Sequence, residues 1–199
     1  MTHSSITVRQ TVSLAVSLLV LVLAAHTAQA QVFVGADAGV SVLSQEDHAP
    51  PICCGERDSW SSPGGRVGGR LGYSIGWFFV RADAGVAPHR VTTRDDVELR
   101  LVSPDLALML GAQARHEKLT VDFALGAGKR WFSGSAISSR PNSSDWEIDK
   151  SAPDLRISFG VHRTLAGGHR LGADFSLAKV MIAQNVVMLS LVYSWAVQG

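Results

Sequence analysis

The stretch Gly35-Ala36-Asp37-Ala38-Gly39-Val40 recurs almost unchanged as Arg81-Ala82-Asp83-Ala84-Gly85-Val86. The same frame returns as Thr120-Val121-Asp122-Phe123-Ala124-Leu125 and as Gly172-Ala173-Asp174-Phe175-Ser176-Leu177. Small or apolar residues stand on both sides of each aspartate. Because successive side chains of a β-strand point to opposite faces, each aspartate is predicted to lie on one face and its apolar neighbours on the other. Four such strands, with strands of a second kind between them, predict a closed β-barrel with a charged interior.

The first 30 residues have the pattern of a secretory signal peptide. A polar start that carries Arg9 precedes an apolar run over residues 11–25, and Ala28-Gln29-Ala30 is a small-x-small cleavage site. The run is shorter than the ~20 apolar residues that a membrane-spanning helix needs. We therefore expect a cleaved signal peptide at 1–30 and one mature domain at 31–199. An uncleaved N-terminal anchor is the alternative that the cleavage site disfavours.

The charged residues are balanced in number and unusual in kind. Arg9 is the one basic residue of the signal, so the mature chain has 17 basic and 17 acidic residues. This neutral balance gives no support for a nucleic-acid partner. The chain has fourteen Arg against four Lys, and twelve Asp against five Glu. Short Asp and planar Arg suit packed, paired charges, whereas Lys and Glu suit surfaces in water. The composition thus favours interior charges.

Alternation of apolar and polar residues predicts eight strands with short turns at one end. The connections at 44–64 and 133–153 are long and polar, and the one at 91–97 is intermediate. Longer loops on one side are typical of outer-membrane barrels, where they face outside, and an even strand number leaves both termini in the periplasm. Pro104 interrupts the fourth strand and leaves the direction of the side chains before it open. The expected strands are about 32–43, 65–75, 77–89, 98–115, 119–132, 154–164, 169–180 and 185–197.

A barrel in water shows the same alternation as a barrel in lipid, with its faces exchanged. Many residues of the apolar face are alanines, which would leave voids in the core of a soluble barrel but cost little against fluid lipid. Aromatic residues fall near strand ends, where interfacial girdles belong. We therefore predict a transmembrane barrel, with a soluble lipocalin-like barrel as the alternative. The expected girdle residues are Tyr73, Trp77, Phe78, Trp131, Phe132, Tyr193 and Trp195.

The polar face of the strands is predicted to form a charge network in the lumen. The four recurring aspartates are expected at one level near the periplasmic end, with arginines on the same inward face. Buried charges persist when they are paired, and removal of one partner costs roughly 3–5 kcal/mol. We expect an interior plugged by Asp–Arg pairs. The network is predicted to contain Asp37, Arg66, Arg70, Arg81, Asp83, Asp105, Arg115, Asp122, Arg130, Arg156 and Asp174.

This arrangement resembles the small eight-stranded outer-membrane barrels of the OmpA/OmpX type over almost the whole mature chain. The resemblance implies an all-β, eight-stranded, antiparallel up-and-down transmembrane β-barrel in the outer membrane of a Gram-negative bacterium. It also implies contact with outer-membrane lipid and lipopolysaccharide, and folding by the barrel assembly machinery. We expect no cofactor and no nucleic-acid partner.

Candidate catalytic and metal-binding residues are few. The first long loop holds Asp47, His48, Glu56, Asp58 and the adjacent cysteines Cys53-Cys54, but these cysteines lack the spacing of common zinc sites. Some barrels of this size modify lipid A with Ser and His. Ser158 and His162 share an inward face but lie about 13 Å apart along a strand, too far for a nucleophile and its base.

His89 lies near an outer strand end. Trp146 stands in the second long loop, where a contact with a surface partner and a return to the barrel rim are both open. We therefore expect a non-enzymatic protein with a structural or surface-interaction role. The alternatives are a small gated channel, a lipid-modifying enzyme and a soluble ligand-binding barrel.

Overall fold

The computed structural model describes residues 30–45, 60–92, 97–138, 145–180 and 184–197. The expected signal peptide apart from Ala30, and the loop with Cys53-Cys54 and its metal-ligand types, lie outside these residues. No helix in the described part of the chain is long and apolar enough to cross a membrane.

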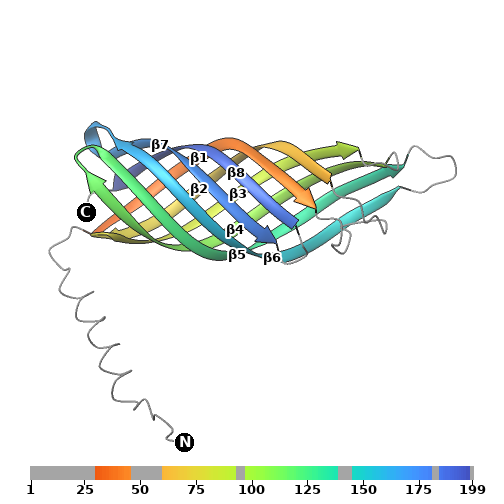
Figure 1. The fold of residues 1–199 in the computed structure, drawn as a ribbon, viewed down its shortest axis with the longest axis horizontal. Coiled ribbons are helices and arrows are strands. Elements are labelled where there is room, and N and C mark those ends of the chain that lie inside the picture. The colour runs from red at the N-terminus through yellow and green to blue at the C-terminus, as the bar shows by residue number, and fades with distance from the viewer. Residues whose placement is uncertain (1–29, 46–59, 93–96, 139–144, 181–183, 198–199) are drawn as a thin grey trace, which may run out of the picture.

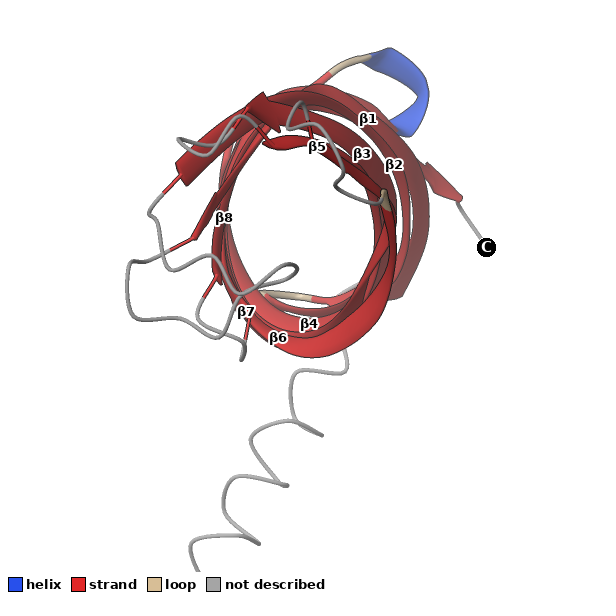
Figure 2. Ribbon diagram, turned by 90° about the vertical axis from the view of Figure 1, so that its right-hand side faces the viewer, coloured by secondary structure: helices blue, strands red, loops and turns tan. Residues whose placement is uncertain are grey.

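Eight antiparallel strands close into a barrel in sequence order, with the last strand paired to the first (Figure 1, Figure 2). Each strand pairs with its chain neighbours, which is the up-and-down arrangement expected from the sequence. A single turn of 3-10 helix, η1 (Ala166–Gly168), connects two of them. The strands are β1 (Ala30–Gln45), β2 (Trp60–Ile75), β3 (Phe78–Thr92), β4 (Val97–His116), β5 (Leu119–Ser138), β6 (Trp146–Thr164), β7 (His169–Val180) and β8 (Gln184–Val197).

Three tight turns lie together at one end of the barrel, which we call the short-turn end. They join β2 to β3, β4 to β5 and, through η1, β6 to β7. Gly76 and Glu117 adopt positive φ angles of 57° and 51° in the first two of these turns, the left-handed region that tight turns use. Val32 pairs with Val197, so the chain enters and leaves the barrel at this same end (Figure 1).

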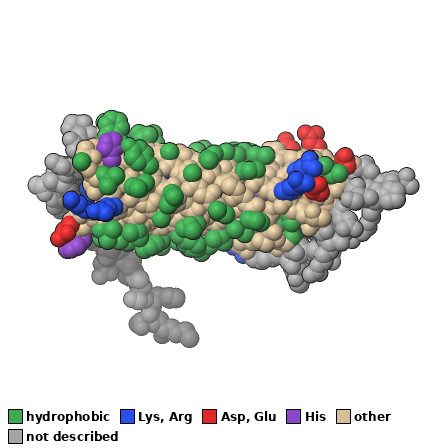
Figure 3. Space-filling view, turned by 90° about the horizontal axis from the view of Figure 1, so that it is seen from above, with side chains coloured by type: hydrophobic (Ala, Val, Ile, Leu, Met, Phe, Trp, Pro, Cys, Tyr) green, Lys and Arg blue, Asp and Glu red, His purple; other side chains and the backbone are tan. Residues whose placement is uncertain are grey.

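The outside of the barrel is apolar around its middle (Figure 3). Leu191 is 71% exposed and Leu108 is 58% exposed, and charged side chains gather at the two ends. A soluble protein does not expose an apolar surface of this extent, whereas a lipid-facing band of this kind is the mark of a transmembrane barrel. The soluble lipocalin-like alternative therefore fails, because the apolar residues face out and the charged residues face in.

Several strands are longer at the far end than the sequence pattern predicted. Residues 133–153 were expected to form a loop, but Ser133 pairs with Asp149, β5 reaches Ser138 and β6 begins at Trp146. In this part of β6, Ile148 is buried while Glu147 and Asp149 are exposed. The strand has left the lipid here, so its polar residues face water and its apolar residues face in. The prediction of a loop was wrong because here the outward face is polar and the inward face is apolar, which is the reverse of the pattern in the lipid-facing part of the strands.

The same extension occurs in β2, which begins at Trp60 inside the predicted loop 44–64. Pro104, in contrast, changes neither the register nor the facing of β4. The pairs Val102–Ser133 and Asp105–Arg130 share one offset, and Leu101 is buried on the same face as Asp105. The proline interrupts only the pairing to β5 between these two pairs.

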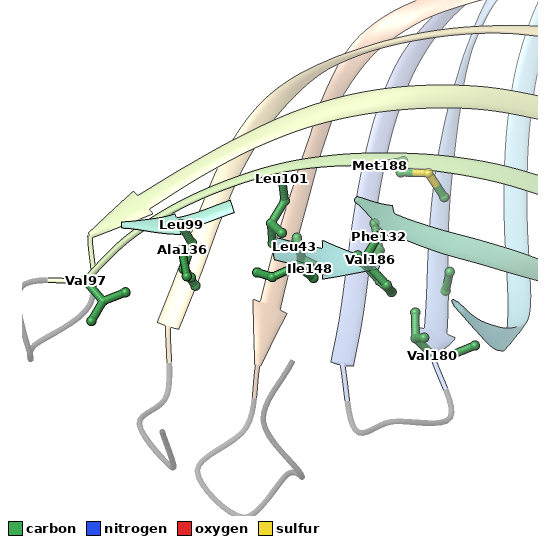
Figure 4. Close-up of a cluster of buried hydrophobic side chains, with 12 residues drawn as sticks. Leu43, Val97, Leu99, Leu101, Phe132, Ala136, Ile148, Val180, Val186 and Met188 are labelled. Atoms are coloured by element: carbon green, nitrogen blue, oxygen red, sulfur yellow. The ribbon is translucent and has the colours of Figure 1, made fainter. Parts of the chain in front are cut away.

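Buried apolar side chains fill the lumen near the far end (Figure 4). Phe132 is among them, fully buried, so its expected place in the outer aromatic girdle is wrong. The regular β2–β3 pairing ends at Val67–Val86, although the two strands stay in contact beyond it, where Ser62 Oγ donates to the backbone oxygen of Arg90 over 2.9 Å. The β6–β7 pairing ends at Asp154–Val180, where β7 itself ends. The far end thus continues the closed barrel, with apolar side chains inside it. This outer apolar cluster contains Leu43, Val97, Leu99, Leu101, Phe132, Ala136, Ile148, Ala152, Ala178, Val180, Val186 and Met188.

Candidate functional site: the lumen charge network

The charged side chains that the sequence placed in the lumen come together there, with one exception. Each stands on the inward face of its strand and alternates with a lipid-facing residue, and Arg130 is fully buried. Arg115 is exposed at the short-turn end and, within the described residues, has no carboxylate at ion-pair distance. The predicted residues that are buried in the lumen, each at most 8% exposed, are Asp37, Arg66, Arg70, Arg81, Asp83, Asp105, Asp122, Arg130, Arg156 and Asp174.

The layer nearer the short-turn end is centred on Asp174 and Arg81. Arg70 donates to Asp174 over 2.6 Å from Nη1 to Oδ2. Arg81 donates to Asp83 from Nε over 2.9 Å, and its Nη1 lies 3.7 Å from Asp174 and 3.8 Å from Asp122. One guanidinium therefore ties three of the four recurring aspartates together.

The layer farther from the short-turn end is centred on Asp105. Arg156 Nη2 lies 2.8 Å from Asp105 Oδ1, and Arg130 Nη2 lies 3.5 Å from Asp105 Oδ2. Arg66 joins the two layers, because it pairs with Asp37 through one nitrogen and lies 3.4 Å from Asp105 through the other. The pairs form one connected network across the middle of the barrel.

Two further residues join the network. Asp154 was not predicted for it, whereas His162 was predicted to share the inward face but was not counted among its charges. Asp154 Oδ2 accepts a hydrogen bond from Arg156 over 3.0 Å, and it lies two residues before Arg156 on the same face. His162 Nε2 lies 2.8 Å from Asp122 and 3.0 Å from Asp174. The period-2 pattern contained both signals, since each residue shares the inward face of β6 with Arg156. Asp154 was missed because it stood at the start of the predicted strand.

Glycine makes room for the guanidinium groups. A Cβ atom placed on Gly85 would overlap the Arg66 guanidinium, and one on Gly68 would press on both Asp37 and Arg66. An eight-stranded barrel is only just wide enough for its interior side chains. Inward-facing glycines therefore let long arginine side chains cross the lumen and reach acids on other strands.

The network is electrically balanced. Six buried aspartates, the five predicted ones and Asp154, face five buried arginines and His162. With His162 protonated, six positive groups meet six negative groups. Buried charges persist in this paired form, and the pairs fill the lumen with hydrogen-bonded groups.

The arrangement offers no serine nucleophile with its base. Ser158 Oγ accepts from Arg81 Nη2 over 2.8 Å, and His162 is held by two aspartates. His89 Nδ1 lies 3.1 Å from the backbone oxygen of Ser62. Within the described residues, no serine hydroxyl is hydrogen-bonded to a histidine ring.

One group has the residue types of a metal site. The ligand atoms of Asp122, His162 and Asp174 lie within 4.8 Å of one another. The same carboxylates also form ion pairs with Arg70 and Arg81, which already balance their negative charge. This group therefore fits an ion-paired histidine better than a metal centre.

Comparison with known proteins bears on the fold. No family model and no curated protein sequence matches the chain. Among solved structures, a major outer membrane protein from Thermus thermophilus matches with a TM-score of 0.55 at 13% identity, over 84% of this chain and 99% of that one. The chain has the fold of the small outer-membrane β-barrels. This confirms the resemblance that the sequence showed.

Two other structures match this small outer-membrane barrel over nearly their whole length. Ail, the attachment invasion locus protein of Yersinia pestis, in complex with the heparin analogue sucrose octasulfate, has a TM-score of 0.52 at 10% identity, covering 84% of this chain and 99% of Ail. Neisserial surface protein A has a TM-score of 0.50 at 17% identity, covering 84% and 98%. At such identities the similarity concerns the fold alone.

Proposed function

We propose that this protein is a non-conducting, non-enzymatic protein of the bacterial outer membrane that carries a protruding sheet on the cell surface. The observation that carries the proposal is the buried ion network across a lumen surrounded by an apolar belt. A barrel plugged by paired charges holds its shape in lipid and leaves no open path for ions. The part of the molecule left for function is then the part outside the lipid.

The protruding sheet is formed by β4, β5 and β6 beyond the end of β7. Over Trp146–Pro153, β6 pairs with β5, whereas its register with β7 begins only at Asp154. Within the described residues, β7 does not extend along this stretch, and the edge of a sheet can add another extended chain. Trp146 is 40% exposed at the start of this edge and adds an apolar contact. The names of two barrels with the same fold, an attachment protein and a surface protein, support a role at the surface.

The lipid contacts follow from the same orientation. Arg90 and Arg100 flank Glu98 on the outer surface beyond the belt, with side chains 71% and 55% exposed. We assign these arginines to contact with the anionic groups of lipopolysaccharide, since guanidinium groups bind phosphate well. Both chain ends of the barrel then lie in the periplasm, and folding by the barrel assembly machinery stays a prediction.

The orientation is tested by cysteine labelling on intact cells. The background carries Cys53→Ser and Cys54→Ser, and a membrane-impermeant maleimide reports exposure. Asp149→Cys, on the protruding sheet, is expected to be labelled on intact cells. The matched control Glu117→Cys, in the β4–β5 turn, is expected to be labelled only after the outer membrane is permeabilised. The reverse pattern would contradict the proposed orientation.

Membrane location is tested by fractionation and gel mobility. The mature protein is expected in the outer-membrane fraction and, without boiling, as a faster band that resists sodium dodecyl sulfate. A soluble periplasmic protein without a mobility shift would overturn the proposal.

A further inference from the structure

The short-turn mouth of the lumen carries positive charge that the network does not balance. Arg115 on β4 and Arg170 on β7 stand at inward-facing positions close to the turns. The six buried aspartates are already matched by five arginines and His162. These two guanidinium groups are therefore in excess at this end of the barrel.

The contacts of the two arginines show that neither is neutralised. Arg170 Nη2 donates to the uncharged Gln31 side chain over 3.2 Å. Arg115 has no ion pair within the described residues. The charge of Arg115 acts unfavourably on Arg170, and Asp122 attracts Arg170 only from beyond ion-pair distance. Two guanidinium groups at one mouth, neither of them in an ion pair within the described residues, favour an anion there.

A pocket lies beside these charges. Arg170 lines it together with Arg70, Arg81 and His162 of the network, and Asp122 adds a carboxylate, so that the basic lining groups outnumber the acidic one. Gln113 and Ser194 add an amide and a hydroxyl that can hydrogen-bond to an oxyanion. Phe33 and Phe79 supply apolar walls, and the Arg81 guanidinium lies 5.5 Å from the Phe79 ring centre.

We propose that this mouth binds a phosphate group. Guanidinium groups present several donors in a fixed plane, and Arg–phosphate hydrogen bonds are charge-assisted and often bidentate. A cation is the wrong occupant, because the balanced network and the two extra arginines leave the mouth with net positive charge. Two sources offer the same chemistry: a soluble phosphate monoester, or the headgroup of an anionic phospholipid in the adjacent leaflet. The proposal is independent of the surface role, since it concerns the opposite end of the barrel.

The test is a binding titration with the refolded barrel. Glycerol phosphate is titrated into detergent-solubilised protein by calorimetry, and the barrel is separately bound to vesicles of phosphatidylglycerol or of phosphatidylcholine. Arg115→Gln and Arg170→Gln are each expected to weaken phosphate binding by about tenfold or more, because a hydrogen bond to a charged group is worth at least that factor. The matched control is Arg163→Gln, an exposed arginine on the outward face of β6 at the same end. Each variant is first shown to keep its gel-mobility shift, which separates lost binding from lost folding.

The outcomes separate the sources. Binding of glycerol phosphate that depends on Arg115 and Arg170 supports the proposal with a soluble ligand. A preference for phosphatidylglycerol over phosphatidylcholine that depends on the same arginines supports it with a lipid headgroup. Absence of both effects, or an equal loss in Arg163→Gln, would overturn it.

Discussion

The two halves of the lumen are filled in opposite ways. Toward the short turns and across the middle, the interior is a connected set of Asp, Arg and His side chains, with a small apolar cluster around Phe79 and Met109 beside it, inside strand ladders that close all round. Toward the far end, the interior is the outer apolar cluster, at a level where the regular β2–β3 pairing and strand β7 have ended. Both halves belong to the same strands.

The difference follows from the surroundings of each half. Where lipid covers the outside, the apolar face must point out, and the remaining face carries the polar groups. Where the strands emerge into water, the apolar face points in, as in a water-soluble β-barrel. The apolar face of a strand therefore changes from outward to inward along its length, while its side chains keep alternating with a period of two residues.

The largest expected effect comes from breaking the charged half at its centre. Asp105→Ala leaves Arg66, Arg130 and Arg156 without their shared partner, and an unpaired buried charge costs about 3–5 kcal/mol. The free energy of unfolding in lipid vesicles, from urea titration, measures this loss. Glu98→Ala is the control, because this acid pairs with exposed arginines outside the belt, where pairs contribute little. Similar losses in the two variants would contradict a buried network.

The inversion of polarity is tested on the outward face. Leu108→Arg places a charge in the lipid-facing belt of β4, and such a charge near the bilayer midplane costs about 2–4 kcal/mol. Asp149→Arg makes a comparable change on the exposed surface of β6 beyond the belt and is expected to leave unfolding almost unchanged. If Asp149→Arg were as damaging as Leu108→Arg, the strands would not have left the lipid at that point.

Truncation of a buried apolar side chain in each half of the lumen tests how far the surrounding structure can close the cavity that is left. Leu101 and Met109 are both buried on the inward face of β4, and truncation of either to alanine falls in the range of about 2–5 kcal/mol. Leu101→Ala is expected near the lower end, because the regular β2–β3 pairing has ended at this level and the wall of the barrel can move inward. Met109→Ala is expected near the upper end, because the strand pairing around the barrel is complete at its level. The opposite order in urea unfolding would argue against a more adaptable far half.

The smallest effect is a local one, where the regular pairing between β2 and β3 ends. Backbone amides of β2 in residues 60–66 are expected to include unprotected positions, whereas residues 67–75 pair with both β1 and β3. Hydrogen exchange of the barrel in micelles reports this difference, since amides outside a ladder exchange through small openings. Uniform protection along β2 would mean that regular hydrogen bonding between β2 and β3 continues beyond Val67–Val86 in solution.

The period-2 pattern was sufficient to place most of the network. Asp37 and Arg70 were assigned to the inward face from alternation alone, and Asp105 keeps its facing even after Pro104. The sequence did not predict which aspartates each arginine would contact. Arg81 contacts Asp83 on its own strand and also acids on β5 and β7. Such contacts depend on the tilt of the strands and on how far each side chain reaches across the lumen.

The sequence failed where the environment of a strand changes. Phe132 has the chemistry of a girdle residue but lies inside the outer apolar cluster, and residues 133–153 read as a polar loop because their outward side chains face water. Arg115 has the inward facing of a network residue but lies too close to the turn to be covered. Alternation identifies the two faces of a strand, but not where along the strand the lipid ends.

The most direct test of a sealed lumen is electrical conductance. The purified mature protein in planar lipid bilayers with concentrated KCl is expected to give no current steps, because the paired charges fill the cross-section. Stepwise currents in the wild-type protein that disappear in Asp83→Asn or Arg81→Gln would contradict this account and show a path for ions through the network.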